Sequence, residues 1–135
     1  MSGEQTLKDR ILSEMTTDYK NTLEKNFDLA KQFIRVTPEG RVDVLMRDKL
    51  TGEDKISLYF IGKLYAKEVG HAATDHVTYK ELAEELGIGM GSLMPWVKGL
   101  RDKKIIKAVK DGVHTMSVGL VEQTLKKIHK KLDGK

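Results

Sequence analysis

The residues best suited to chemistry are basic and stand close together in the last third of the chain. Between positions 98 and 114 the sequence places Lys98, Arg101, Lys103, Lys104, Lys107, Lys110 and His114. Cationic side chains at this density suit phosphate binding, because a nucleic acid releases condensed counterions wherever a protein neutralises its phosphates. The alternative interpretation of the same charges is a solvated basic surface that has no partner.

The division of charge along the chain points to the same region. Residues 1–55 carry 10 basic and 11 acidic side chains, residues 56–88 carry 3 and 5, and residues 89–135 carry 11 and 4. The formal net charge of +4 therefore comes from the C-terminal third. Such an excess is the electrostatic footprint expected of a phosphate-binding face.

No pattern in the sequence indicates an active site. We find no Walker-type phosphate loop, no dinucleotide-binding glycine pattern after a strand and no serine elbow. His71, Asp75 and His76 could meet at a metal, but their spacing matches no strong zinc signature, and solvated loop histidines are the default interpretation. We expect a protein that is not an enzyme and holds no cofactor.

The composition predicts a protein with one principal core, and we expect this protein in the cytoplasm. The chain has 135 residues, 39% of them hydrophobic and 33% charged, which allows a core under a charged surface. Cysteine is absent, as is common in a reducing interior. No stretch reaches the roughly 18 apolar residues of a membrane span, and residues 1–10 show no apolar leader. We expect neither export nor a membrane partner.

The first 55 residues are predicted to form a long helix and a small β-hairpin. Apolar side chains recur at helical spacing from Leu7 to Ile34, so one helix should end near Arg35. A Pro-Glu-Gly turn at residues 38–40 then predicts a hairpin over residues 34–46. The long helix could pack on its own domain or on a second copy, so residues 1–55 are a candidate element for a homodimer.

The next elements follow from capping residues. Thr51 to Asp54 has the form of a capping box, so a helix should begin there and stop near Gly70. Thr78 and Glu81 predict a second, reciprocal box at the start of a helix that runs to Leu86. Strands over residues 105–109 and 113–118 should form a hairpin whose Asp-Gly turn at 111–112 favours type I′.

The stretch from Tyr79 to Leu100 resembles the helix-turn-helix of bacterial and archaeal winged-helix regulators. Ala83 is small where two helices should cross, and Gly87 stands where the turn needs positive φ. The core positions of the motif are Ile88, Leu93, Val97 and Leu100. The resemblance implies an α+β, mainly helical fold with a winged helix-turn-helix domain at residues 56–118. It further implies that a helix from about Ser92 to Lys103 enters the major groove of DNA while the hairpin approaches the backbone or minor groove.

The predicted recognition helix departs from the usual pattern. Ser92 is its only polar side chain before Lys98, and taking Ser92 as the N-cap places Pro95 in the first turn. Met94 and Pro95 could press on thymine methyl groups or contact a protein. Aromatic residues next to helix-turn-helix core positions, here Tyr79 and Trp96, are more often packing than base-stacking residues.

Two functions remain open, besides the less favoured alternative of an enzyme with a metal at His71, Asp75 and His76. The first is a DNA-binding regulator of transcription that holds double-stranded DNA mainly through its phosphates. Its predicted contacts are Ser92, Met94, Pro95, Lys98, Arg101, Lys103, Lys104, Lys107, Lys110 and His114. The second is a protein-interaction module that docks a partner on Met90, Met94, Pro95 and Trp96.

Residues 119–135 should form a basic amphipathic helix. We favour packing of this helix on the core over the alternatives, which are pairing in a dimer, phosphate binding and binding to an anionic membrane.

Overall fold

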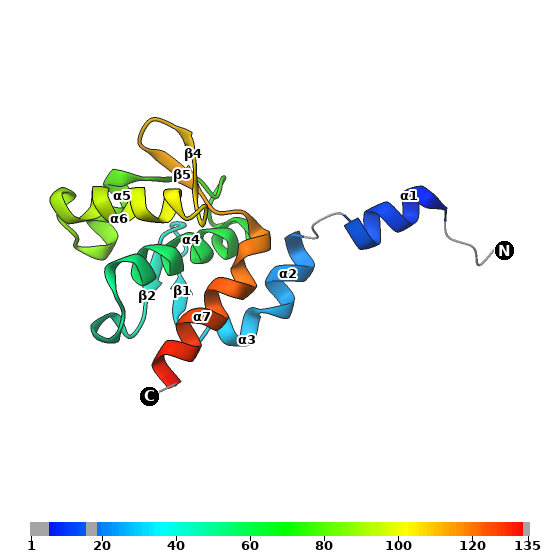
Figure 1. Ribbon diagram of the computed structural model, residues 1–135, viewed down its shortest axis with the longest axis horizontal. Coiled ribbons are helices and arrows are strands. Elements are labelled where there is room, and N and C mark those ends of the chain that lie inside the picture. Colours follow the sequence, from blue (N-terminus) through cyan, green and yellow to red (C-terminus); the bar gives the residue numbers. More distant parts are fainter. Residues whose placement is uncertain (1–5, 16–18, 134–135) are drawn as a thin grey trace.

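The computed structural model describes residues 6–15 and 19–133 and has an α+β fold (Figure 1). Within this part of the chain, seven α-helices accompany two small antiparallel sheets. The central element is α4 (Gly52–Glu68), in which 10 of 17 residues are buried. A helix that is buried on most of its circumference needs neighbours on several sides, and the remaining elements supply them.

The single long N-terminal helix was a wrong prediction. The structure has α1 (Leu7–Arg10), the π-helical turn η1 (Ile11–Met15), α2 (Tyr19–Lys25) and α3 (Phe27–Ala30), and residues 16–18 lie outside the described part. Asn26 separates α2 from α3, and its Nδ2 donates to the carbonyl of Thr22 at 2.9 Å, a local bond that competes with regular helix. Leu7 and Met15 are 73% and 80% exposed, so the apolar stripe of α1 and η1 has no core to cover.

The predicted hairpin is confirmed as β1 (Ile34–Val36) and β2 (Val42–Val44), with Ile34 opposite Val44. Ile34 belongs to this strand and not to the preceding helix, because β-branched residues gain burial by pairing across strands against α4. The hairpin approaches α4 closely at Gly62, where an added Cβ would lie 2.4 Å from Cγ1 of Val42. The 3-10 turn η2 (Arg47–Lys49) then leads to α4.

The capping residues act as predicted in one case and only partly in the other. The hydroxyl of Thr51 accepts from the amide of Asp54 at 3.1 Å, and the carboxylate returns to the amide of Thr51 at 3.4 Å. The amide of Glu81 likewise donates to Thr78 at 3.0 Å, but the carboxylate of Glu81 does not return. It lies 3.1 Å from Nζ of Lys63, so a buried ion pair between helices replaces the second half of the box.

After α4, the chain forms β3 (Val77–Thr78), α5 (Tyr79–Leu86) and α6 (Met90–Asp102). Gly70 and Gly87 both have positive φ, at 88° and 64°, as their places at helix ends predicted. Strands β4 (Lys107–Lys110) and β5 (Val113–Thr115) are shorter than predicted and join β3 in the order β3-β5-β4. A type I′ turn needs positive φ at both central residues, and only Gly112 has it, so that turn type was a wrong prediction.

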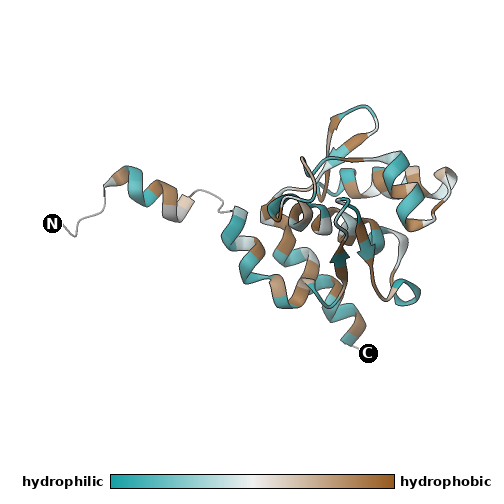
Figure 2. Cartoon of the chain, turned by 180° about the vertical axis from the view of Figure 1, so that it is seen from behind, coloured by the Kyte–Doolittle hydropathy of each residue, from teal (hydrophilic) through white to brown (hydrophobic). Residues whose placement is uncertain are grey.

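The chain ends with the 3-10 turn η3 (Val118–Leu120) and α7 (Val121–Asp133), whose Val121, Leu125 and Ile128 are buried. Packing on the core, the favoured interpretation for this helix, is therefore confirmed. One apolar cluster extends from Leu23 to Ile128 and joins the three segments predicted at 1–55, 56–118 and 119–135. Figure 2 shows hydrophilic and hydrophobic stretches alternating along the helices. No helix among the described residues combines the length and apolarity needed to cross a bilayer.

Candidate functional site

Helix α6 begins three residues earlier than the predicted N-cap implies. Its N-cap is Gly89, whose carbonyl accepts from the amide of Leu93 at 2.9 Å, so Ser92 as the N-cap was a wrong prediction. Pro95 consequently lies inside the helix, beyond its first turn. The backbone bond that Pro95 cannot donate is the one to Gly91, which is exposed and can be hydrated instead.

The outward face of α6 is neutral over its first half. Met90 and Met94 are 44% and 50% exposed, and Ser92 and Pro95 are exposed beside them. The inward face carries the predicted core residues Leu93, Val97 and Leu100, all buried. Three predicted DNA-contacting residues, Ser92, Met94 and Pro95, are therefore exposed on α6, and none of them carries a charge.

The two aromatic residues pack as predicted. An added Cβ at Gly52 would lie 2.4 Å from Cε3 of Trp96, so the half-buried indole rests against the first turn of α4. Tyr79 meets His114 edge to face, with ring centroids 5.4 Å apart. These contacts tie α6 to α4 and α5 to β5, which fixes the position of the basic end of α6.

The predicted cations divide into two groups by their partners. Nζ of Lys98 lies 2.9 Å from the carboxylate of Asp102, and Nζ of Lys103 lies 2.7 Å from that of Glu53. Within the described part of the chain, no carboxylate pairs with the other four. We call these four the unpaired cations, and they are Arg101, Lys104, Lys107 and Lys110. Their charge is free to act on a ligand.

Lys104 has an unusual backbone conformation. It follows α6 with φ of 64°, and the amides of Lys104 and Ile105 donate to the carbonyls of Arg101 and Leu100. This pattern is the Schellman motif, in which glycine is the preferred residue at the left-handed position. An L-residue there costs about 1–2 kcal/mol relative to a right-handed conformation. The chain has a lysine at this position despite the strain, and this lysine places an ammonium group at the end of α6.

His114, one of the predicted DNA contacts, is not at the surface of the protein. It belongs to β5 and is 2% exposed. Its Nε2 lies 3.1 Å from Nη1 of Arg101. Burial, and next the charge of Arg101, lower the pKa of His114 below its ordinary value. The neutral imidazole therefore acts as a hydrogen-bond acceptor that orients Arg101.

Three of the unpaired cations surround one cavity. Arg101, Lys104 and Lys107 line a space of about 300 Å³ between the end of α6, the start of β4 and η3. Ser117 and Leu120 form the opposite wall. We call this space the η3 cavity. Sequence reasoning missed both wall residues, although a serine just before a helix is a recognisable N-cap signal.

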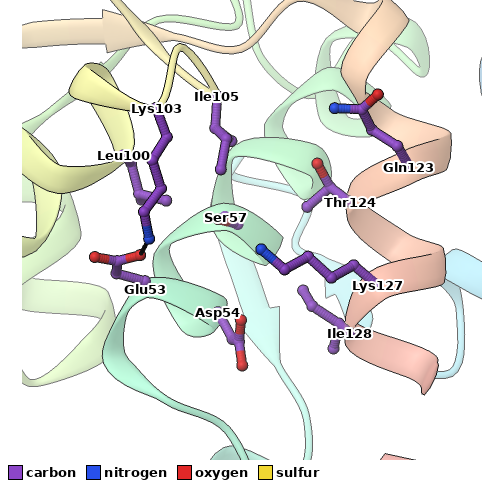
Figure 3. Close-up of a pocket in the computed structure, with 10 residues that line it drawn as sticks. All are labelled: Glu53, Asp54, Ser57, Leu100, Lys103, Ile105, Gln123, Thr124, Lys127 and Ile128. Atoms are coloured by element: carbon purple, nitrogen blue, oxygen red, sulfur yellow. Dashed lines mark hydrogen bonds and ion pairs between the residues drawn. The ribbon is translucent and has the colours of Figure 1, made fainter. Parts of the chain in front are cut away.

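A second cleft, between α4, α6 and α7, has mixed charge (Figure 3). Lys103 reaches Glu53 across it, and Lys127 extends from α7 toward α4. Lys131 also pairs with Asp54, at 2.7 Å. Lys103 and Lys131 already pair with carboxylates, and Glu53 and Asp54 line the cleft, so it is a poorer site for an anion than the η3 cavity. Ile105 lines both spaces.

Nε2 of His76 lies 3.9 Å from a carboxylate oxygen of Asp75, but this contact does not make a metal site. The carboxylate of Asp75 accepts from the hydroxyl of Thr115 at 2.8 Å and lies 3.8 Å from Nζ of Lys67. Among residues 6–15 and 19–133 no group of three or more His, Asp or Glu side chains is placed to hold a metal ion. In comparisons with known proteins, no family model, no curated protein and no solved structure matches the chain.

Proposed function

We propose that the protein is a winged helix-turn-helix regulator that binds double-stranded DNA mainly through phosphate contacts. The order of α4, α5, the Gly87 turn, α6 and the β4–β5 hairpin supports the fold, since it is the order that the resemblance implies. The proposed interface is the C-terminal end of α6 together with β4. This is a smaller surface than the sequence alone suggested.

The observation that carries the proposal is the set of unpaired cations. Arg101, Lys104, Lys107 and Lys110 follow one another from the last turn of α6 to the end of β4, and all four residues of β4 are exposed. Cations that have no carboxylate partner bind a phosphate without first breaking an ion pair. Their position at the base and edge of a protruding hairpin allows them to follow a DNA backbone (Figure 1).

The same arrangement argues for weak sequence preference. Base edges in the major groove are read by Arg, Asn, Gln and other side chains with matching donors and acceptors. The outward face of α6 has only Ser92 of this kind before Lys98, and Lys98 already pairs with Asp102. We propose that binding is dominated by phosphate contacts and that base contacts contribute little.

The test is a titration of duplex DNA at several salt concentrations. Four phosphate contacts predict a slope of log K against log salt of about −3.6, at roughly 0.9 per contact. Lys49→Ala is the matched control, because Lys49 is an exposed lysine on η2, outside the proposed interface. The control should leave the slope unchanged. Failure to bind at low salt, or affinity that does not depend on salt, would overturn the proposal.

A second candidate function is supported by the apolar face of α6. Exposed Met90 and Met94 beside Pro95 form a surface suited to a protein partner, since methionine adapts to varied shapes. Met94→Glu separates the two functions. If the protein is an interaction module, this variant should lose its partner; if it binds DNA through phosphates alone, affinity for DNA should fall only modestly, through the added negative charge.

A further inference from the structure

The η3 cavity has both cationic and apolar residues in its lining. Arg101, Lys104 and Lys107 are the cationic residues, and Ile105 and Leu120 are two of the apolar ones. Among the residues that the structure describes, no carboxylate lines the cavity, in contrast to the cleft of Figure 3, which has Glu53 and Asp54 in its lining. Among the spaces around the C-terminal end of α6, this is the one whose positive charge is not balanced from within.

The cationic and the apolar residues of the lining together favour a ligand that has an anionic group and an organic body. Convergent cations favour a phosphate or another anion, because guanidinium and ammonium groups form charge-assisted hydrogen bonds with its oxygens. The hydroxyl of Ser117 makes no capping bond and adds a further polar group on the opposite wall. The apolar lining residues favour a ligand with an organic body, and about 300 Å³ is at the small end of ligand pockets.

The backbone at Lys104 is a separate observation in favour of a site. Glycine would fit its left-handed conformation without strain, yet the chain has a lysine whose side chain lines the cavity. Strained residues of this kind concentrate at binding sites, where a side chain is kept despite its unfavourable backbone. Arg101 is likewise held in place, by its hydrogen bond to buried His114.

We infer that the η3 cavity binds one phosphate ester, with the phosphate at Arg101, Lys104 and Lys107 and the sugar against Ile105 and Leu120. The ester can be one unit of a DNA backbone or a free nucleotide. In the first case the inference rests on the proposed function, and it names the point at which the backbone is held. In the second case the cavity is a small-ligand site, and its occupation neutralises three cations that DNA would otherwise use.

The experiment is an amide NMR titration of the full chain with three probes: inorganic phosphate, thymidine monophosphate and a 16-base-pair duplex. Thymidine monophosphate should shift the amides of residues 104–108 and 117–120 and leave those of residues 123–128, which border the Figure 3 cleft, unchanged. Inorganic phosphate should shift the same amides with at least threefold weaker affinity, because it has no sugar. Equal affinity for the two, or shifts spread over the surface, would overturn the inference.

Lys104→Gly is the decisive variant, since it removes the charge and relieves the strained backbone at the same position. Its melting temperature should equal or exceed that of the unmodified protein, while affinity for thymidine monophosphate should fall at least fivefold. Lys127→Ala is the matched control, because Lys127 lines the other cleft, and it should change affinity less than twofold. Equal losses in the two variants would overturn the inference.

The duplex separates the inference from the proposed function. If thymidine monophosphate shifts the cavity amides and the duplex does not bind, the inference stands for a free nucleotide and the DNA proposal fails. If the duplex binds, Lys104→Gly does not weaken it and thymidine monophosphate does not bind, the DNA proposal stands and the inference fails.

Discussion

The guanidinium of Arg101 meets Nε2 of His114 at 3.1 Å beneath the β4–β5 hairpin. Arginine has only donors, so Nε2 must accept and the imidazole must be neutral, with its proton on Nδ1. Tyr79 covers the ring from α5. One buried side chain thus links the last turn of α6, the hairpin and α5, and a proton added to it would place two positive charges in contact.

This contact predicts how stability depends on pH. Because the pKa of His114 is lowered in the folded protein, the unfolded chain binds more protons as pH falls through 6.5. The free energy of unfolding should therefore decrease from about pH 7 toward pH 5, until the folded-state pKa is passed. Urea unfolding of the unmodified protein and of His114→Gln measures this. The variant keeps an acceptor but cannot titrate, so an equal pH slope in both would refute the prediction.

Because Lys63 and Glu81 form a buried ion pair, we expect a variant that loses Lys63 alone to be clearly less stable than a variant that loses both charges. Lys63 also donates to the carbonyl of Gly40 at 2.8 Å, and the hydroxyl of Tyr59 donates to Glu81. Lys63→Met leaves a buried carboxylate without its cation, which should lower the free energy of unfolding by about 3–5 kcal/mol. Adding Glu81→Gln removes that charge and should recover part of the loss. Chemical denaturation of both variants checks the order, and a double variant less stable than the single one would contradict it.

The contact of Gly52 with Trp96 predicts that a single methyl group disturbs α6. An added Cβ would overlap the indole at 2.4 Å, and overpacking of this kind commonly costs about 1–3 kcal/mol. Trp96 is the only tryptophan in the sequence, so its fluorescence reports on this contact directly. Gly52→Ala should shift the emission and lower the melting temperature. The control is Gly91→Ala, where an added Cβ has no neighbour within 4 Å; it should leave the emission unchanged.

Signals that depend on a few neighbouring residues predicted more of this fold than the apolar periodicity over long segments did. The Thr51 capping box, the left-handed Gly87 and the hairpin at Ile34 each depend on a few neighbouring residues, and the structure has all three. The long first helix failed because its periodic stripe continued through Ile34, whose burial in a strand depends on contact with α4. Periodicity alone cannot distinguish these two ways of burying an apolar side chain.

The sequence predicted which cations belong to the candidate site, but only part of how they are arranged and paired. Sequence identified every cation at the end of α6, but it could not show that Glu53 neutralises Lys103, because 50 residues separate them. The carboxylate of Glu81 was assigned to a cap for the same reason, since its partner Lys63 lies on another helix. Burial of His114 depends equally on contacts made by α5 and α6.

The division of cations by partner leads to a last prediction, about the salt dependence of DNA binding. Lys107→Ala removes an unpaired cation, so the slope of log K against log salt should become shallower by about 0.9. Lys103→Ala removes a lysine whose ammonium lies 2.7 Å from Glu53, and it should change the slope by clearly less, since that charge is already compensated. Fluorescence anisotropy at four salt concentrations measures both slopes. Equal changes would mean that Lys103 leaves Glu53 to bind DNA, and the interface would then extend from the η3 cavity across Ile105 into the neighbouring cleft.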